Sequence, residues 1–411
     1  MRRTASVGII FFTVFMDLLG FGMVLPLMPL YAADPRFQAS AAEIGWLMAI
    51  FSLMQFFFAP LWGRLSDRIG RRPVLLIGLF GSAFSYLLYG LAQSYIVLLL
   101  ARAMAGIMGA NIAVAQAALA DLTTPEKRTK AMGLIGVAFG LGFILGPALG
   151  SLTSAQGLAA APLLAALVTG INALAAFFWL GESYPPEQRS HTTRRGHPLW
   201  GEPWQEAKKL RGALQICFLM GLFTLLFAAF EVIMPLWGRD QWQWTVQTVG
   251  WIFTYIGVVA VIVQGGIVRH LAARWGEKKT AALGLLLVTV GIALFIHDQF
   301  SMVLLALALV AAGSGLVHPG LSSLVSLNCS AQQQGLMLGL FQSMSALGRG
   351  VGPVLGGVAY QQWPAPVFLW IALGLGLAWL VLLRMRHLLR DSRASNGDGQ
   401  NGSSNASPGA P

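Results

Sequence analysis

The residues Gly63-Arg64-Leu65-Ser66-Asp67-Arg68-Ile69-Gly70-Arg71-Arg72-Pro73 connect two long apolar runs with a stretch crowded with charge. Glycine allows a tight turn and a close approach of helices. Asp67 can pair with an arginine or cap the helix that follows. A preference for positive charge on one side of a membrane would explain the arginines, but not the aspartate and glycines at this spacing. The stretch therefore predicts a structured, charged loop between two helices.

The composition around this stretch is that of a membrane protein. Hydrophobic residues make up 56% of the 411 residues and charged residues only 10%, whereas soluble domains carry about 25% charged residues. The apolar residues fall into runs of about 20, long enough to cross a bilayer as helices. The net charge of +11 is spread over short connections, so nucleic acid is not an expected partner. Cys217 and Cys329 have no metal-type spacing, and no metal, cofactor or disulfide is expected.

The apolar runs predict an all-α membrane protein with twelve transmembrane helices in two six-helix bundles. The long run after Met1 has no small-residue cleavage site, so it is interpreted as the first helix rather than a signal peptide. The twelve segments are 5–32, 43–63, 74–92, 95–121, 131–153, 160–180, 212–237, 247–270, 279–297, 300–328, 333–361 and 365–388. The predicted domains are a bundle over 1–180, a cytoplasmic linker over 181–211, a second bundle over 212–390 and a disordered tail over 391–411.

The distribution of Lys and Arg predicts the topology. With a cytoplasmic N-terminus, 23 of the 27 basic residues fall on the cytoplasmic side. The opposite side holds only Arg36 and Arg239, while Arg102 and Arg349 lie within helices. This bias predicts that both termini are cytoplasmic.

The two bundles are predicted to be repeats of one another. Gly45-Trp46 recurs as Gly250-Trp251, and Gly146-Pro147 recurs as Gly352-Pro353, at an offset of 205 or 206 residues. Parallel repeats of six spans occur in transporters whose binding site lies between the bundles near the midplane. A transporter is therefore favoured over a membrane enzyme or sensor, for which we find no nucleophile–base pair, metal cluster or nucleotide loop.

Three charged residues within the helices are candidates for proton coupling, because an intramembrane charge is costly and is kept for a function. Asp17 and Glu231 can each bind and release a proton, since desolvation favours the neutral carboxyl. Arg102 needs a partner or a water-filled cavity. The alternatives are a packing hydrogen bond for Asp17, simple solvation near the outer interface for Glu231, and an Arg102 side chain that reaches that interface.

Further candidates are a glycine motif and a set of polar residues. In the fifth helix, glycines allow close helix contact and proline bends the helix; no strand precedes this motif, so it is not a dinucleotide loop. Its residues are Gly142, Gly146, Pro147 and Gly150. The polar residues can line a substrate cavity or instead hydrogen-bond between helices. They are Gln55, Asn111, Gln116, Asn172, Gln264, His318, Gln342 and Arg349.

The stretch 63–73 resembles the loop between helices two and three of the major facilitator superfamily, Gly-x-Leu-Ala-Asp-Arg-x-Gly-Arg-Arg, with Ser66 in place of Ala. The resemblance implies a cytoplasmic gating latch that pairs with neighbouring helix ends in the outward-facing state and releases on rotation. The latch residues would be Gly63, Asp67, Arg68, Gly70, Arg71, Arg72 and Asp121, the last as partner of Arg71 or Arg72. The matching segment of the second half has no aspartate, so the latch is expected to be one-sided.

Within this superfamily the chain resembles the tetracycline-efflux group of drug–proton antiporters. The likeness rests on Asp17-x-x-Gly20-x-Gly22, on Arg102-x-x-x-Gly106 and on the helix-five motif, which resembles the antiporter motif of exporters. It implies a role for Arg102 in proton coupling. Tetracycline exporters carry acids in helices three and nine, but 82–86 and 285–288 contain none. The residues therefore do not favour tetracycline as the substrate.

These observations predict a proton-coupled transporter that exports a small amphipathic drug or metabolite by alternating access. It would reside in the bacterial inner membrane and work as a monomer. The alternative is a proton symporter or facilitator that imports a nutrient or metabolite.

Overall fold

The computed structural model describes residues 2–109, 111–184, 210–297 and 299–385, and these are almost entirely helical. Most of the predicted linker (185–209) and the whole predicted tail (391–411) lie outside the described residues. The helices of the first half are α1 (Arg2–Val24), η1 (Leu25–Leu27), α2 (Met28–Ala32), α3 (Ala41–Ile69), α4 (Arg71–Gly90), α5 (Tyr95–Met108), α6 (Asn111–Leu122), α7 (Pro125–Ser154) and α8 (Ala160–Trp179). Those of the second half are α10 (Arg211–Trp242), α11 (Val246–Ile262), η3 (Val263–Ile267), α12 (Val268–Trp275), α13 (Glu277–Ala293), η4 (Leu294–Ile296), α14 (Phe300–Leu327), α15 (Ala331–Gln362) and α16 (Pro366–Arg384).

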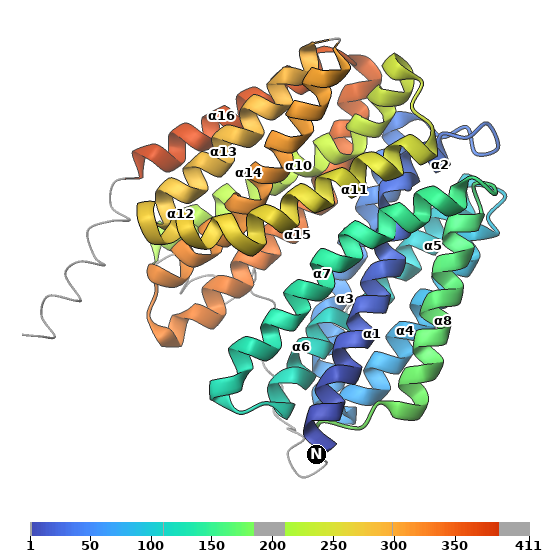
Figure 1. Cartoon of the computed structure of the whole chain (residues 1–411), viewed down its shortest axis with the longest axis vertical. Helices are drawn as coiled ribbons and strands as arrows, with labels where there is room; N and C mark the ends of the chain where they lie inside the picture. The colour runs from blue at the N-terminus through green and yellow to red at the C-terminus, as the bar shows by residue number, and fades with distance from the viewer. Residues whose placement is uncertain (1, 110, 185–209, 298, 386–411) are drawn as a thin grey trace, which may run out of the picture.

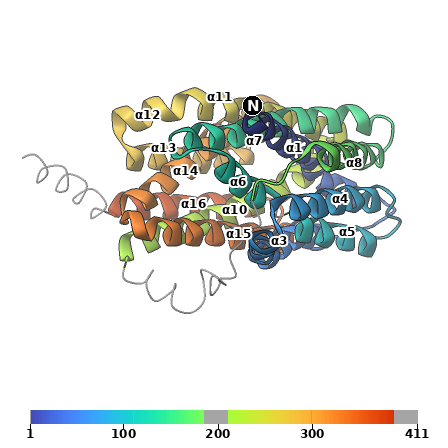
Figure 2. The same ribbon diagram turned by 90° about the horizontal axis from the view of Figure 1, so that it is seen from below.

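In the described part of the chain, ten helical stretches are long and apolar enough to cross a membrane. Two further helices run beside them: α13 packs against α14 and α16, and α15 packs against α10 and α3. Figure 2 shows α1–α8 on one side of the molecule and α10–α16 on the other. The helical architecture and the division into two groups therefore agree with the predicted fold class.

The two groups touch chiefly through α3 against α15 and α7 against α11. We call the end of the molecule that carries the N-terminus, Gly70 and Gly276 the N-terminal face, and the end that carries Ser40 and Gln243 the opposite face. The groups converge near α2 on the opposite face and diverge toward α6 and α12 on the N-terminal face (Figure 1). The shape is that of two bundles held together at one end.

The charged stretch is more helical than the sequence predicted. Helix α3 continues through Ile69, and α4 begins at Arg71, so Gly70 alone forms the connection. Its φ of 107° lies in a region that residues with a Cβ rarely adopt, which explains the glycine. Gly276 has a φ of 79° at the matching position 206 residues later. Gly63 lies within α3 with open space beside it, so the prediction that it forms part of a tight turn was wrong.

The predicted helix over 95–121 is interrupted. Helix α5 ends at Met108 and α6 starts at Asn111, with Gly109 between them. Two side chains of α3 donate hydrogen bonds to carbonyl groups at the break: Gln55 Nε2 to Gly109 (2.9 Å) and Trp62 Nε1 to Ile107 (2.5 Å). A break within a membrane helix is tolerated when neighbouring side chains satisfy the freed backbone groups in this way.

Candidate functional site

The contact between the halves on the opposite face follows the internal repeat. Gly45 of α3 lies against the carbonyl of Pro353 in α15, and a Cβ there would collide with that oxygen. A Cβ at Gly250 of α11 would lie 2.5 Å from Ser151 Cβ and 3.0 Å from the Pro147 carbonyl oxygen of α7. Because Gly45 and Gly250 are repeat equivalents, and the two prolines are as well, the contact is made twice. Only glycine permits this approach.

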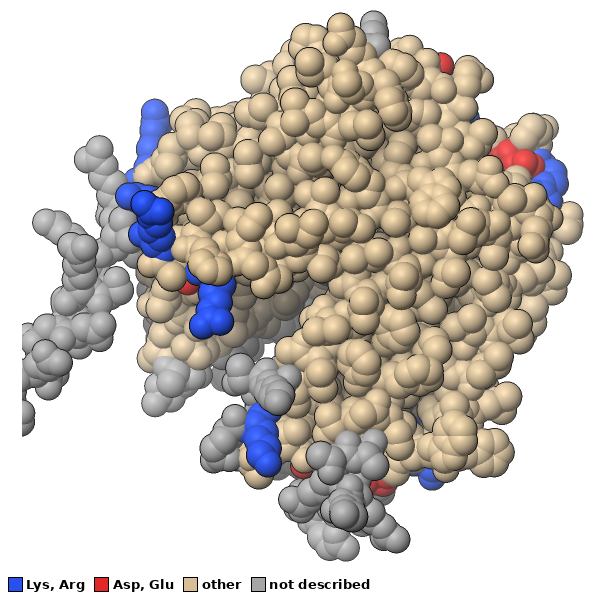
Figure 3. Space-filling model, in the orientation of Figure 1, with Lys and Arg blue, Asp and Glu red and all other residues tan. Residues whose placement is uncertain are grey.

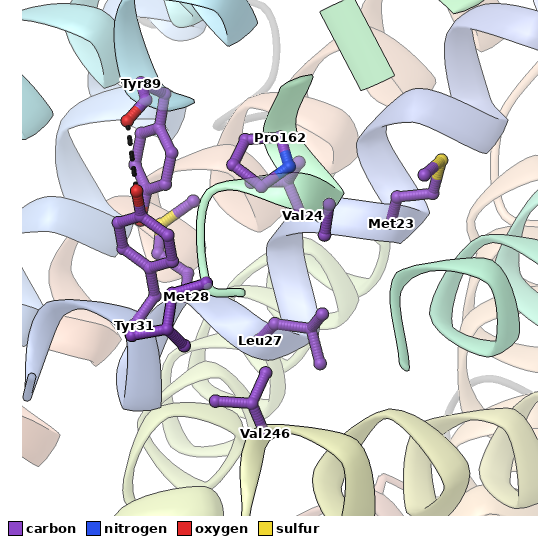
Figure 4. A pocket seen from close by; sticks show the side chains of 10 residues that line it. Met23, Val24, Leu27, Met28, Tyr31, Tyr89, Pro162 and Val246 are labelled. Atoms are coloured by element: carbon purple, nitrogen blue, oxygen red, sulfur yellow. Dashed lines mark hydrogen bonds between the residues drawn. The ribbon is translucent and has the colours of Figure 1, made fainter. Parts of the chain in front are cut away.

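A small, almost wholly apolar pocket lies beside this contact. Met23, Leu27, Met28 and Tyr31 of the first half line it, and Val246 of α11 faces them from the second half (Figure 4). The Tyr31 hydroxyl points toward the Tyr89 carbonyl oxygen, 3.4 Å away. Apolar packing therefore seals the opposite face.

On the N-terminal face the same helices separate. The last close approach between α7 and α11 is at Gly140, where a Cβ would lie 3.1 Å from Val261. Beyond it, no described residue lies within 4 Å of such a Cβ at Gly133 and Gly136 of α7 or at Gly265 and Gly266 of η3. Figure 3 shows the surface hollowed between the halves on this side. The site is therefore a cavity that opens to the N-terminal face.

The charged residues of the N-terminal face form a network centred on Arg71. Its guanidinium donates to Asp67 (Nη1–Oδ1, 2.6 Å), to Asp121 (Nε–Oδ2, 3.1 Å) and to Ser66 Oγ (2.6 Å). The pair expected between Asp121 and one of the two arginines is thus present at Arg71. All of these partners belong to the first half, whereas Arg68 is exposed.

Glu182, just after α8, is a partner that the sequence analysis did not identify. Its carboxylate accepts hydrogen bonds from the backbone N–H groups of Arg71 (2.9 Å) and Arg72 (3.4 Å), so it caps α4. The Tyr184 ring lies 4.9 Å from the Arg71 guanidinium carbon. The capping role considered for Asp67 is therefore filled by Glu182. These contacts exist while the N-terminal face is open, so the expectation that the pairing of Arg71 releases on opening is not met here.

Arg102 and Asp17 lie inside the first half. Arg102 is only 2% exposed, so it does not reach an interface as the alternative proposed. Its guanidinium carbon lies 4.5 Å from the centre of the Phe51 ring, and its Nε and Nη2 atoms have no hydrogen-bond partner among the described residues. Asp17 and Arg102 both act electrostatically on the Tyr86 hydroxyl, from α1 and α5 respectively.

Glu231 meets an arginine of the second half that the sequence analysis counted only among the polar residues. Glu231 on α10 and Arg349 on α15 are both partly exposed within the helices and act on each other electrostatically. His318 on α14 also feels the charge of Arg349. Glu231, His318 and Arg349 therefore lie on three helices, α10, α14 and α15, that pack against one another.

Five of the residues predicted to line the cavity fall into three groups. Gln116, Gln264 and Gln342 are exposed, although they lie within helices long enough to cross a membrane or packed among them. Gln55 is half-buried and donates to the Gly109 carbonyl oxygen, so its amide closes the helix break. The side chain of Asn111 lies outside the described part of the structure.

The helix-five motif has two different contact faces. Gly142, Gly146 and Gly150 pack against α1 of the same half, where a Cβ would approach backbone atoms of α1 to 2.5–3.1 Å. Pro147 faces α11 of the other half, and the Ser151 hydroxyl donates to the Gln247 carbonyl oxygen across the boundary (2.7 Å). The motif thus joins α7 to α1 and to the second half together.

Two kinds of comparison bear on this arrangement. The family model of the Major Facilitator Superfamily matches residues 10–271 and 216–407. The tetracycline resistance protein, class C, of Escherichia coli is 31% identical over 385 residues, which cover 93% of this chain and 94% of that protein.

Solved structures resemble this chain over nearly its whole length. The crystal structure of the human organic anion transporter MFSD10 (TETRAN) has a TM-score of 0.68 at 27% identity and covers 92% of this chain and 99% of its own. The nucleoside transporter NupG has a TM-score of 0.77 at 16% identity, and the match covers 92% of this chain and 98% of NupG. At this low identity, the similarity supports the fold alone. These findings confirm the resemblance to the tetracycline-efflux group. The chain is a multi-pass membrane transporter of small molecules and belongs to the major facilitator superfamily.

Proposed function

We propose that this chain exports small amphipathic molecules from the bacterial cytoplasm, driven by protons that move inward, by alternating access. It would have twelve spans in the inner membrane, both termini in the cytoplasm, and function as a monomer. The observation that carries the proposal is the cavity between the halves, which is sealed by glycine and apolar contacts on one face and open on the other. With the basic N-terminal face in the cytoplasm, this is the state that admits a molecule from inside the cell.

The proposed coupling residues are Asp17 and Arg102 in the first half and Glu231 in the second. Asp17 would take up a proton in one state and release it in the other, and the fixed charge of Arg102 would favour release. Their shared interaction with Tyr86 supports this pairing. Arg71, Asp67 and Asp121 would hold the N-terminal face of the first half rigid while the halves rotate.

The direction of transport rests on the helix-five motif and on the relatives. Pro147 and Ser151 of this motif meet the second half where the opposite face is sealed, and the relatives named above include a tetracycline resistance protein. An importing symporter or facilitator remains the alternative. It is favoured by the lack of a carboxylate at 82–86 and 285–288, where the efflux group has acids.

Inverted membrane vesicles acidified by ATP hydrolysis test the proposal. The panel is ethidium, norfloxacin, chloramphenicol and tetracycline, with alkalinisation of the lumen on addition of compound as the readout. We expect at least one compound to release protons through the native chain, and Asp17→Asn to abolish this release. Asp34→Asn is the matched control, because Asp34 pairs with Arg36 outside the helices (2.9 Å). Proton release that survives Asp17→Asn would refute the coupling assignment, and uptake of a compound by intact cells down its gradient would favour the importer.

A further inference from the structure

Arg349 is an intramembrane cation whose hydrogen-bonding capacity is largely unused. Its Nη1 donates to Ser345 Oγ (2.8 Å), and the Ser345 hydroxyl also contacts Thr224 Oγ1 of α10 (3.3 Å). Among the described residues, no carboxylate lies within the 4.0 Å of an ion pair with Arg349. A guanidinium has five N–H donors. A charge placed this way in a membrane helix requires a further partner or a wet cavity.

Access distinguishes Arg349 from the other arginines near the cavity. Arg102 is enclosed by protein and is only 2% exposed. Arg71 is already paired with Asp67 and Asp121 and hydrogen-bonded to Ser66. Arg349 is partly exposed, so protein does not enclose its side chain as completely as that of Arg102.

Aromatic side chains on α10, α14 and α15, which pack against one another, suit an anion with an aromatic body. His318 is exposed in the middle of α14, and its ring meets Phe341 edge to face, with centroids 5.5 Å apart. On α10, Phe227 lies one turn before Glu231, and its ring stacks on that of Phe223. The planar fork of a guanidinium binds a carboxylate through two parallel hydrogen bonds. Glu231 supplies the only negative charge that the structure brings to bear on Arg349 within the described residues.

We propose that Arg349 recognises a carboxylate on the transported molecule, with His318 beside it and Glu231 as the counter-charge that balances Arg349 when the site is empty. This inference rests on the proposed transport function and names its substrate class, an aromatic carboxylate. Glu231 repels such a ligand, so its neutralisation strengthens anion binding. If Glu231 were itself the group that binds a cationic substrate, the same change would weaken binding of a cation.

Three compounds with one ring system provide the test: 2-naphthoate, the neutral 2-naphthamide and the cationic 2-naphthylmethylammonium. Their dissociation constants are measured by calorimetry on the full chain in nanodiscs. We expect the native chain to prefer naphthoate over the amide by at least about tenfold. Arg349→Gln is expected to weaken naphthoate about 10- to 100-fold, the value of hydrogen bonds to a charged group, with the amide little changed. Arg349→Lys keeps the positive charge but not the forked geometry, so its affinity for naphthoate is expected to lie between those of the native chain and Arg349→Gln.

Two further variants separate recognition from misfolding. Glu231→Gln is expected to tighten naphthoate binding severalfold, a gain that a damaged protein would not show. Arg384→Gln makes the same chemical change at the exposed end of α16 and should leave all three dissociation constants unchanged.

Equal affinity for the three compounds, no naphthoate binding at millimolar concentration, or a charge preference retained by a folded Arg349→Gln would each overturn the inference. The vesicle assay is independent of these outcomes. Selective naphthoate binding without proton release would refute proton coupling and leave the carboxylate site standing.

Discussion

The glycines that seal the opposite face give the sharpest prediction. Gly45→Ala and Gly250→Ala each add one methyl group where the two halves meet. At Gly250 the new carbon would lie 2.5 Å from Ser151 Cβ and 3.1 Å from Ser151 Cα. At Gly45 it would meet the backbone of Pro353 and Val354. In both cases the obstacle includes backbone, which cannot turn aside as a flexible side chain can.

The cost falls on one conformation. Overpacking of this kind costs about 1–3 kcal/mol. If the halves separate on the opposite face in the alternate state, that state has room for the methyl group and is not destabilised by it. The equilibrium should then shift toward the alternate state by a factor of about 5 to 150. The shift should be similar for the two variants, because their contacts are related by the repeat.

Distances between spin labels on Gln93 and Gln362 measure the shift. Both residues are exposed near the opposite face, one in each half, and Cys217 and Cys329 are first replaced by alanine. We expect a longer distance component to grow in both variants. Gly265→Ala is the control, since it adds the same methyl group where nothing lies within 4 Å. An unchanged distance distribution in folded Gly45→Ala and Gly250→Ala, or an equal change in the control, would show that these contacts do not set the equilibrium.

Six further variants, two of them controls, test the remaining contacts. Glu182→Gln weakens the cap of α4 and should lower the unfolding temperature by the equivalent of about 1 kcal/mol. The control Glu277→Gln, in the first turn of α13, should not lower it. An equal fall in the unfolding temperature of both variants would contradict the capping role. Asp121→Asn should destabilise more than Asp67→Asn, because the Asp121 side chain is 23% exposed and that of Asp67 is 48% exposed. Ser151→Ala removes the hydrogen bond to the Gln247 carbonyl oxygen, and at about 0.6 kcal/mol for such a bond in a membrane it should shift the spin-label populations about threefold. Ser154→Ala, which loses only a bond within α7, should leave those populations unchanged.

The sequence predicted the features that depend on local composition and on repetition. Apolar runs located the long helices, because membrane-spanning segments must be apolar throughout. The offset of 205 or 206 residues predicted that the halves are repeats, and the structure adds that the repeated residues make reciprocal contacts, Gly45 with Pro353 and Gly250 with Pro147. Asp121 was predicted as a partner of Arg71 or Arg72 because it lies at a helix end on the same face.

The features that the sequence did not predict depend on which groups meet in space. Hydropathy falls at Gly63, but α3 continues to Ile69 because polar residues can extend a helix beyond the membrane. Glu182 looked like one charge of a polar linker, and nothing local indicates that its carboxylate reaches the N-terminus of α4, 110 residues earlier. The grouping of Glu231, His318 and Arg349 requires the mutual rotation of three helices, which hydropathy does not report.

The repeat also separates two functions within the charged stretch. Arg72 donates through Nη2 to the carbonyl oxygen of Phe177 near the end of α8 (2.6 Å). Its repeat equivalent, Lys278, donates to the carbonyl oxygen of Leu383 near the end of α16 (3.1 Å), and Phe177 and Leu383 are themselves 206 residues apart. A cation that binds the free carbonyl groups at a helix C-terminus is favourable, so each half uses the same clamp.

Arg71 has no such equivalent, because the matching residue is Glu277. The clamp formed by Arg72 and Lys278 therefore belongs to the fold of either half, whereas the pairs of Arg71 with Asp67 and Asp121 belong to the first half alone. In this structure the network joins groups of one half only, so its role as a gating latch stays a prediction. The contacts that join the halves are those of α3 with α15 and of α7 with α11, and a rotation between the halves must be carried by them.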